Sequence, residues 1–363
     1  MAKVVISGYY GFDNTGDEAI LAAMIQALRK QEEKVEITVL SANPVKTASA
    51  YGVKAVSRNS LSQIIQELKS SQLFLSGGGG LLQDVTSQRT VPYYLSLVYL
   101  AKMLGVPTAF YAQGVGPLEG KLGRFLTAKI GRKVDLVTLR DEKSRQELLH
   151  LGFSPEKIVV TADPVFGLLP EGDGLKLLEQ EGIVKDQRPL LGISLRSWQG
   201  LENYQQVVAQ VAQKAMEKWQ AQVLFLPFHL PGDYETCWKV ASLIPGETRV
   251  LSGNYHPTNY LSLIGQLDFL LGMRLHALIF AARMGVPFLG ISYDPKIDRF
   301  LELAGRQPGL SVEAIEFSSL WSLLEKTWND KIAISQQLPK QIQPLEEKAL
   351  ENARLVWQLV KAR

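Results

Sequence analysis

The sequence is poor in the residues that bind metals or form disulfides. Among its 363 residues there is a single cysteine, Cys237, so the chain cannot form an internal disulfide or a cysteine-rich zinc site. Its four histidines, at positions 150, 229, 256 and 276, do not show the spacing of paired metal ligands. We therefore expect neither a metal site nor a resident cofactor.

The charge balance and the hydrophobic runs exclude two further classes of partner. The formal net charge is +3, and no run of five or six like charges occurs, so nucleic acid is not an expected partner. No apolar run reaches the roughly 18 residues of a membrane-spanning helix. The opening run VVISGYYGF lacks the longer apolar core and the cleavage site of a signal peptide. These features favour a cytoplasmic protein.

The order of apolar runs predicts an α/β fold with two domains. Strand-like runs lie at residues 4–10, 35–41, 54–57, 73–76, 108–113, 136–139 and 158–161, and again at 190–195, 223–227, 267–271 and 286–291. Helical patterns between them indicate parallel sheets covered on both faces. We expect Rossmann-like domains at residues 1–170 and 190–337, a linker at 171–189 and a C-terminal helix at 338–363. Ligands of such domains bind beyond the carboxyl ends of the strands, here in a cleft between the halves.

Basic residues gather in the stretch LDFLLGMRLHALIFAARMGVPFLGISYDPK, residues 267–296. Arg274 and His276 open its helix, where free N–H groups already attract anions, and Lys296 follows the next strand. In a parallel sheet these loops lie at the same edge, so the stretch predicts an anion site. Each residue also has a structural interpretation. Arg274 can pair with Asp268 or Asp294, His276 can be an interior histidine, and Lys296 can be solvated.

Another arginine ends a strand of the same domain. Arg196 closes the run LLGISLR and would point toward the same edge as Arg274. A surface salt bridge is the alternative for this side chain. His229 occupies the equivalent place one strand later and is weaker evidence.

Two glycine-bearing loops follow strands of the first half. The loop GYYGFDNTGDEAIL does not match the Gly-x-Gly-x-x-Gly spacing, so dinucleotide binding is not supported, and its Asp17 either complements a helix dipole or serves as a base. In LFLSGGGGLLQD, the row from Gly77 to Gly80 lets backbone N–H groups approach a ligand. A tight packing turn is the alternative. Gln83 and Asp84, just past the row, are placed to bond sugar hydroxyls.

The segment GKLGRFLTAKIGRKVD is basic and amphipathic. Residues 121–133 contain five basic residues and no acidic residue, with Leu122, Phe125, Leu126 and Ile130 among them. This pattern suits peripheral contact with an anionic membrane surface, which would place the protein at the inner face of the plasma membrane. A solvated helix packed on its own domain is the plainer interpretation, and we favour it.

Three segments together resemble the polysaccharide pyruvyl transferase family, of the CsaB type: GYYGFDNTGDEAIL, SGGGGLLQD and GMRLHALIFAARMGVPFLGISYDPK. The resemblance runs in order from residue 4 to about residue 296. It implies a GT-B-like fold of two Rossmann-like domains, and transfer of a pyruvyl group from phosphoenolpyruvate onto two hydroxyls of a sugar. By resemblance, the donor binds Arg274, Leu275 and His276 of the Arg-Leu-His triplet, together with Arg196 and Lys296.

The residues and the resemblance agree on a site for phosphoenolpyruvate as co-substrate. We expect His276 to be the general acid or the phosphate partner, and Asp17 or Asp84 to accept the proton of a sugar hydroxyl. The acceptor, a saccharide that is free or lipid-linked, is expected at Asn14, Asp17, Gly78, Gly79, Gln83 and Asp84. Two other functions stay open, a glycosyltransferase that uses a nucleotide sugar and a non-catalytic saccharide-binding protein.

Overall fold

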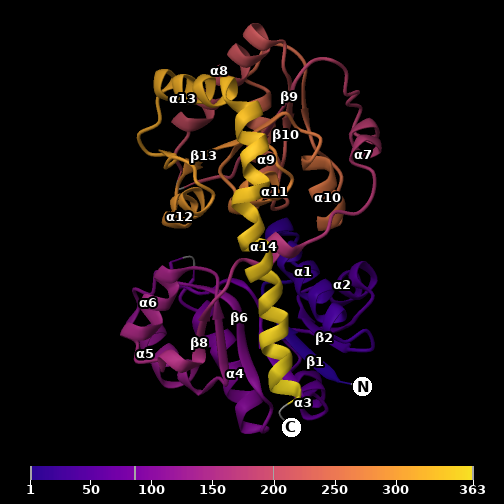
Figure 1. Cartoon of the computed structure of the whole chain (residues 1–363), viewed down its shortest axis with the longest axis vertical. Coiled ribbons are helices and arrows are strands. Elements are labelled where there is room, and N and C mark those ends of the chain that lie inside the picture. Colours follow the sequence, from indigo (N-terminus) through magenta and orange to yellow (C-terminus); the bar gives the residue numbers. More distant parts are fainter. Residues whose placement is uncertain (1, 86, 199, 362–363) are drawn as a thin grey trace. The chain divides into compact units, whose positions relative to one another are not determined.

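The structure is a computed structural model that describes residues 2–85, 87–198 and 200–361. Contacts divide the chain into two units that are each discontinuous in sequence (Figure 1). The first unit comprises Met1–Phe12, Asp17–Leu168 and Leu345–Arg363, and the second comprises Asp13–Gly16 and Leu169–Pro344. The residues expected to form a linker, 171–189, fall within the second unit and carry a helix, α7 (Gly174–Gln180).

The first unit is built on a parallel sheet with the strand order β3-β2-β1-β4-β6-β7-β8, and β5 pairs with β6. This order changes direction between β1 and β4, so the loops after these two strands border the usual ligand position of such sheets. Its strands are β1 (Lys3–Ser7), β2 (Glu36–Ser41), β3 (Lys54–Ser57), β4 (Leu73–Ser76), β5 (Gly79–Leu82), β6 (Thr108–Val115), β7 (Leu136–Leu139) and β8 (Ile158–Val160).

Helices connect these strands, as parallel pairing requires. They are α1 (Thr15–Gln31), α2 (Pro44–Tyr51), α3 (Leu61–Lys69), α4 (Thr90–Met103), α5 (Lys121–Lys129) and α6 (Glu142–His150), with short 3-10 turns η1 (Gly131–Lys133), η2 (Pro155–Lys157) and η3 (Pro164–Gly167). The strands of the core read as apolar runs because the sheet is buried on both faces; β4, for example, is buried throughout.

The second unit repeats this plan with the strand order β11-β10-β9-β12-β13-β14, again in parallel. Here the order changes direction between β9 and β12. The strands are β9 (Leu190–Ser194), β10 (Gln222–Phe225), β11 (Thr248–Val250), β12 (Phe269–Gly272), β13 (Phe288–Ser292) and β14 (Leu310–Ser311), and the helices are α7, α8 (Asn203–Trp219), α9 (Gly232–Ala241), α10 (Pro257–Ile264), α11 (Leu275–Arg283), α12 (Pro295–Leu303) and α13 (Phe317–Asn329).

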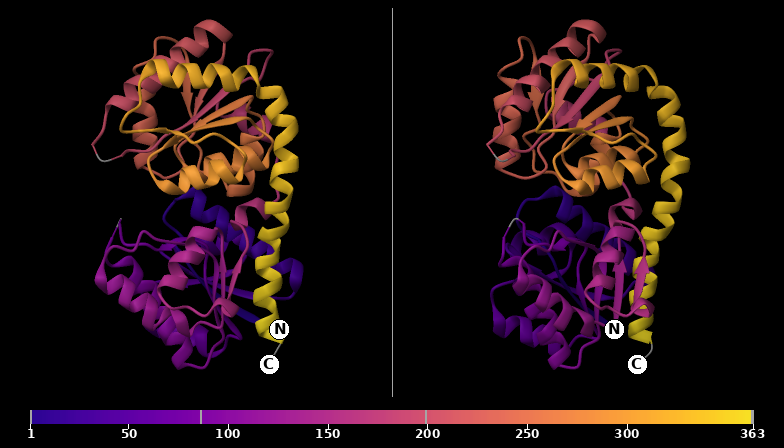
Figure 2. Two further views of the ribbon diagram at one scale, coloured as in Figure 1. Left: turned by 60° about the vertical axis from the view of Figure 1, so that its left-hand side comes forward. Right: turned by 90° about the vertical axis from the view of Figure 1, so that its left-hand side faces the viewer.

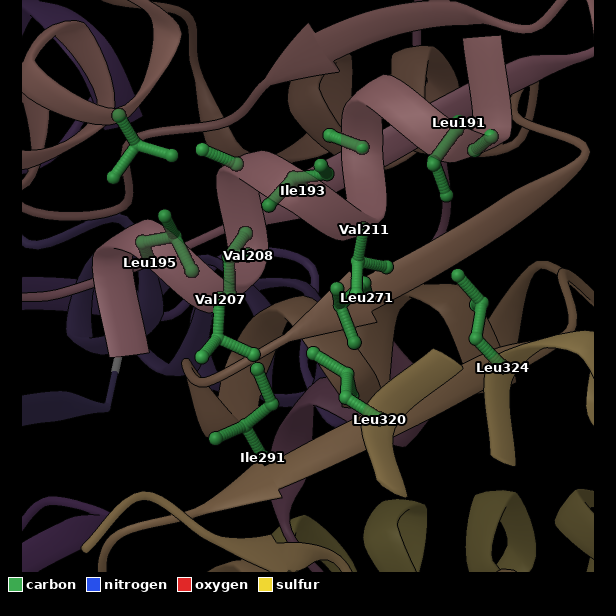
Figure 3. Close-up of a cluster of buried hydrophobic side chains, with 14 of the residues drawn as sticks. Leu191, Ile193, Leu195, Val207, Val208, Val211, Leu271, Ile291, Leu320 and Leu324 are labelled. Carbon is green, nitrogen blue, oxygen red and sulfur yellow. The ribbon is translucent and has the colours of Figure 1, made fainter. Parts of the chain in front are cut away.

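One face of the second sheet packs against α8 and α13. Figure 3 shows side chains from β9, β12 and β13 directed toward those of the two helices. The labelled members of this cluster are Leu191, Ile193, Leu195, Val207, Val208, Val211, Leu271, Ile291, Leu320 and Leu324. This apolar cluster holds the strands in register and thereby fixes the positions of their carboxyl ends.

The chain ends in a long helix, α14 (Lys331–Lys361), which Figure 2 shows as one continuous ribbon. The helix was expected at 338–363 but begins at Lys331, and it contains both Pro339 and Pro344. Its second half belongs to the first unit. There the buried Asn352 bonds Thr161 Oγ1 at 2.7 Å and donates to the carbonyl of Ala162 at 3.2 Å. The second half of α14 therefore completes the core of the first unit, to which β1 also belongs.

Candidate active site

The basic residues singled out in the second unit follow strands that lie next to one another. Ser194 of β9 is aligned with Gly272 of β12, and Gly272 is aligned with Gly290 of β13. Arg196 comes two residues after Ser194, and Arg274 comes two residues after Gly272. Both follow the pair of strands between which the strand order changes direction. Ligands of open parallel sheets bind at this place, so the register explains why these arginines share one edge.

Tyr293, directly after β13, is the centre of this group of cations. Its hydroxyl accepts a hydrogen bond of 2.9 Å from Arg196 Nη1, and the Arg196 guanidinium lies 4.6 Å from its ring centroid. Lys296 Nζ lies 5.2 Å from the same centroid. Burial alone would raise the pKa of Tyr293, but the charges of Lys296, Arg196 and Arg274 lower it below its ordinary value. The three predicted cations thus act on a single phenol, to which the sequence analysis gave no role.

Arg274 is fixed by a carboxylate that the sequence analysis did not name. Its Nε donates to Asp233 Oδ2 at 2.7 Å, and its Nη2 bonds Asp233 Oδ1. Asp233 is buried and also accepts the backbone N–H groups of Phe228 (3.1 Å) and His229 (2.9 Å). A bidentate pair of this kind sets the plane of the guanidinium. Asp233 therefore positions Arg274.

The two carboxylates suggested as partners of Arg274 have other roles. Asp268 Oδ2 accepts the backbone N–H of Leu190 at 2.8 Å. Asp294 caps helix α12 through the backbone N–H of Lys296 at 3.0 Å, and its other oxygen lies 3.1 Å from Lys296 Nζ. Leu275, the middle residue of the triplet, is only 7% exposed. Its side chain is part of the core.

The cluster around Tyr293 predicts a spectroscopic response to anions. An anion bound among Lys296, Arg196 and Arg274 would offset the charges that lower the pKa of Tyr293, so that pKa should rise toward or above the ordinary value near 10. In an alkaline titration followed by tyrosinate absorbance, phosphoenolpyruvate should shift one early-titrating tyrosine to higher pH. The early step should be missing in Tyr293→Phe. An unchanged titration of the wild-type protein at saturating phosphoenolpyruvate would contradict an anion site here.

The loop before α1 packs with the second unit rather than with the first. Asn14 forms an antiparallel bridge with His229, and the N–H of Thr15 bonds the carbonyl of Phe228 at 2.8 Å. A Cβ on Gly16 would lie 2.1 Å from Nδ1 of His276, so only glycine allows this imidazole to lie against the first turn of α1. Asn14, expected in the first domain, belongs to the second unit, and its contact with the acceptor stays a prediction.

Asp17 lies against the glycine-rich loop of the first unit. A Cβ on Gly79, which has φ +96°, would be 3.2 Å from Asp17 Oδ1. Burial raises the pKa of Tyr9, and the negative charge of Asp17 raises it further. The other glycines differ in role, because Gly78 faces Ile20 and the carbonyl of Tyr111, in a packing turn. Asp17 and Gly79, both predicted on the acceptor side, therefore lie next to each other.

Asp84, the alternative base, accepts two backbone N–H groups just before α5. Its Oδ1 accepts the backbone N–H of Glu119 and its Oδ2 that of Gly120, both at 2.8 Å. These bonds hold the two residues that directly precede α5. Because both carboxylate oxygens are engaged by the backbone, Asp84 is poorly suited to accept a substrate proton. Gln83, next to it, is half-buried.

The first unit also contains a cation that the sequence analysis missed. Arg58 follows β3, and its guanidinium lies 5.0 Å from the ring centroid of Phe12 and 4.2 Å from that of Tyr93. Its Nη1 is buried and makes no hydrogen bond within the described part of the chain. Its charge lowers the pKa of Tyr9, which Asp17 raises. The one sequence signal for Arg58 was its position directly after a strand. Its contacts with aromatic rings could not be predicted, because those rings come from distant parts of the sequence.

Comparisons with solved structures identify the fold. A UDP-N-acetylglucosamine 2-epimerase from Neisseria meningitidis bound to UDP-GlcNAc superposes with a TM-score of 0.67 at 13% identity, covering 100% of both chains. A protein of Listeria monocytogenes described as a UDP-N-acetylglucosamine 2-epimerase gives 0.70 at 14% identity, covering 99% of this chain and 96% of that one. Anabaena HepE in complex with UDP and glucose gives 0.66 at 11% identity, with full coverage of both chains. The chain thus has the GT-B-like fold.

The sequence itself matches a family model. A comparison with curated protein sequences found no match. The model of the polysaccharide pyruvyl transferase family, however, matches residues 14–295. This range contains most of the chain, including Asp17, the glycine-rich loop, Arg196, the Arg-Leu-His triplet and Tyr293. The chain therefore belongs to the polysaccharide pyruvyl transferase family.

Proposed function

We propose that the protein transfers the pyruvyl group of phosphoenolpyruvate to two hydroxyls of a saccharide and forms a cyclic ketal. The observation that carries the proposal is the gathering of Arg196, Arg274 and Lys296 around Tyr293 in the second unit. Phosphoenolpyruvate bears a carboxylate and a phosphate on three carbons, so it needs several cations held close together. A neutral sugar needs none of them.

The proposed donor site uses geometry that is set before the ligand binds. Asp233 holds Arg274 in one orientation, and Tyr293 holds Arg196 through its hydroxyl. Donors fixed in this way stabilise developing charge without reorganisation during the reaction. Lys296 Nζ lies 3.1 Å from the neighbouring Asp294, and its side chain is 34% exposed, so it can turn to a ligand phosphate. The phosphate that leaves would remain paired with these cations.

The reaction balances without a cofactor. One hydroxyl of the acceptor attacks C2 of phosphoenolpyruvate while a proton is added to the methylene carbon, which becomes the methyl group. The C–O bond to phosphate breaks, and the second hydroxyl closes the ketal at the same carbon. Of the two hydroxyl protons, one in effect ends on the methyl group and the other on the released phosphate. We assign His276 as the general acid or the phosphate partner, because imidazole titrates near neutral pH.

For the base we propose Asp17 rather than Asp84. Both oxygens of Asp84 accept backbone N–H groups just before α5, whereas Asp17 lies beside the glycine-rich loop, with Oδ1 3.2 Å from the place of a Cβ on Gly79. Arg58 extends the proposed acceptor group with a positive charge between aromatic rings. An aromatic and cationic surface suits a sugar that carries a phosphate, as a lipid-linked acceptor does.

The test is a direct assay of both substrates. The purified protein, with phosphoenolpyruvate and a β-linked N-acetylmannosamine or galactose glycoside, should release phosphate and add the mass of a pyruvyl ketal to the sugar. Phosphoenolpyruvate should also raise the melting temperature more than UDP does. No product across a wide panel of free and lipid-linked acceptors, together with stabilisation by UDP alone, would replace the proposal with a nucleotide-sugar transferase.

A further inference from the structure

Helix α5 of the first unit leaves two of its three large apolar residues exposed, whereas the third, Leu126, packs on the core. Its buried residues are the small Gly123 and Thr127, whereas Leu122 is 59% exposed and Phe125 is 56% exposed. An amphipathic helix that only covers its own domain would bury leucine and phenylalanine first. The favoured interpretation of this segment, a solvated helix packed on its domain, leaves these two exposed side chains unexplained.

The neighbouring helix extends the exposed apolar area. Helix α4 packs against α5 and against the turn η1, and all three belong to the first unit (Figure 1). Tyr99 and Met103 of α4 are 46% and 68% exposed. Lys133 Nζ in η1 lies 5.8 Å from the ring centroid of Tyr99, so the residues of the two segments meet at the surface. We call Tyr99, Met103, Leu122 and Phe125 the apolar patch.

Two lysines lie over aromatic rings of the apolar patch. Lys129 Nζ lies 5.3 Å from the ring centroid of Phe125, and Lys121 and Lys133 are exposed. In the described part of the chain, none of these three lysines lies within 4 Å of a carboxylate. Arg124 differs, because it pairs with Glu147 at 3.1 Å. Exposed apolar side chains next to cations without acidic partners match the headgroup region of an anionic bilayer.

We propose that the apolar patch and its lysines bind the surface of a membrane that contains anionic lipids. The side chains of Leu122 and Phe125 enter the boundary between headgroups and acyl chains, while Lys129 and Lys133 pair with lipid phosphates. A second copy of the chain fits less well, because it would place like charges opposite one another. The contact is interfacial, and no described helix is long and apolar enough to cross a bilayer. The proposal does not depend on the reaction proposed above.

Co-sedimentation with vesicles tests the proposal on the full chain. Vesicles of phosphatidylcholine with phosphatidylglycerol should bind the protein, and vesicles of phosphatidylcholine alone should bind it at least 10-fold more weakly. Lys129→Gln with Lys133→Gln should weaken binding about 30-fold, from about 1 kcal/mol for each basic residue near an anionic surface. Leu122→Ser with Phe125→Ser should weaken vesicle binding at least 10-fold. Added salt should weaken the vesicle binding of the wild-type protein.

Matched variants on the same unit control for charge and hydrophobicity in general. Lys30→Gln with Lys69→Gln removes two exposed lysines, and Val45→Ser with Leu61→Ser removes two side chains that are 82% and 61% exposed. Both controls should bind vesicles as the wild type does, and all variants should keep its melting temperature. Absent binding, equal binding to both vesicle types, or equal losses in the controls would overturn the proposal. The proposal would also be overturned if the wild-type protein were a dimer and the double variant Leu122→Ser with Phe125→Ser were a monomer.

Discussion

Replacing Arg274 by alanine should weaken the binding of phosphoenolpyruvate by 100-fold or more, which is about 3 kcal/mol or more. The change removes a cation that acts on Tyr293 and leaves Asp233 without the guanidinium that now pairs with it. Loss of one partner from a buried ion pair typically costs about 3–5 kcal/mol of folding free energy. Calorimetric titration with phosphoenolpyruvate and chemical denaturation without ligand would measure the two effects separately.

The exposed Arg249 provides the control for this variant. It lies on β11 of the same unit, pairs with Glu247 and is 49% exposed, so Arg249→Ala should change neither quantity measurably. Arg274→Lys keeps the charge but loses the bidentate geometry, and should fall between alanine and the wild type. If Arg274→Ala lowers stability as expected but binds phosphoenolpyruvate normally, the arginine is purely structural and the donor site is wrong.

Replacing Asp17 by asparagine should lower the turnover number by about 10²- to 10⁴-fold, the range of a lost general base. The binding of phosphoenolpyruvate should be unchanged, because the proposed donor contacts lie on other residues. Asp84→Asn is the matched carboxylate variant. It should lose about 1 kcal/mol of stability through weakened bonds to the backbone of Glu119 and Gly120, while keeping most of the turnover.

Steady-state kinetics with denaturation curves for both aspartate variants would separate these roles. The opposite pattern, with Asp84→Asn inactive and Asp17→Asn active, would reverse the assignment of the base. If both variants kept the activity of the wild type, general-base catalysis by either residue would be excluded. A bell-shaped pH profile that loses its acidic limb in Asp17→Asn would support the role of its carboxylate.

Much of the fold could be predicted because its signals are local. Apolar runs bounded by glycine or polar residues gave β3 (Lys54–Ser57), β4 (Leu73–Ser76) and β7 (Leu136–Leu139) with the observed bounds. Elements with weak local signals were not predicted. Strand β5 begins inside the glycine row and exists because it pairs with β6, and α14 continues through two prolines because both of its halves are packed.

The position of three candidate-site residues in the fold could be predicted, because it depends only on the order of the strands. Arg196, Arg274 and Lys296 follow adjacent strands, and alternation of strands and helices was enough to place them at one edge. Their partners could not be predicted, because these come from other parts of the fold. Asp233 opens helix α9, and Tyr293 stood in a recognised motif without a role of its own. Asp84 was predicted to bind sugar hydroxyls. Its bonds to the backbone of Glu119 and Gly120 could not be predicted, because these residues are distant in the sequence.

The interleaving of the two units in the sequence limits how the molecule can be dissected. A fragment that stops at residue 168 would lack the second half of α14, exposing the side of the core that Asn352 now closes. A fragment that starts at residue 169 would lack residues 13–16 of the second unit, of which Asn14 bridges His229. Neither piece is therefore a self-sufficient folding module, and co-expression of the two pieces is the form in which a split protein should regain activity.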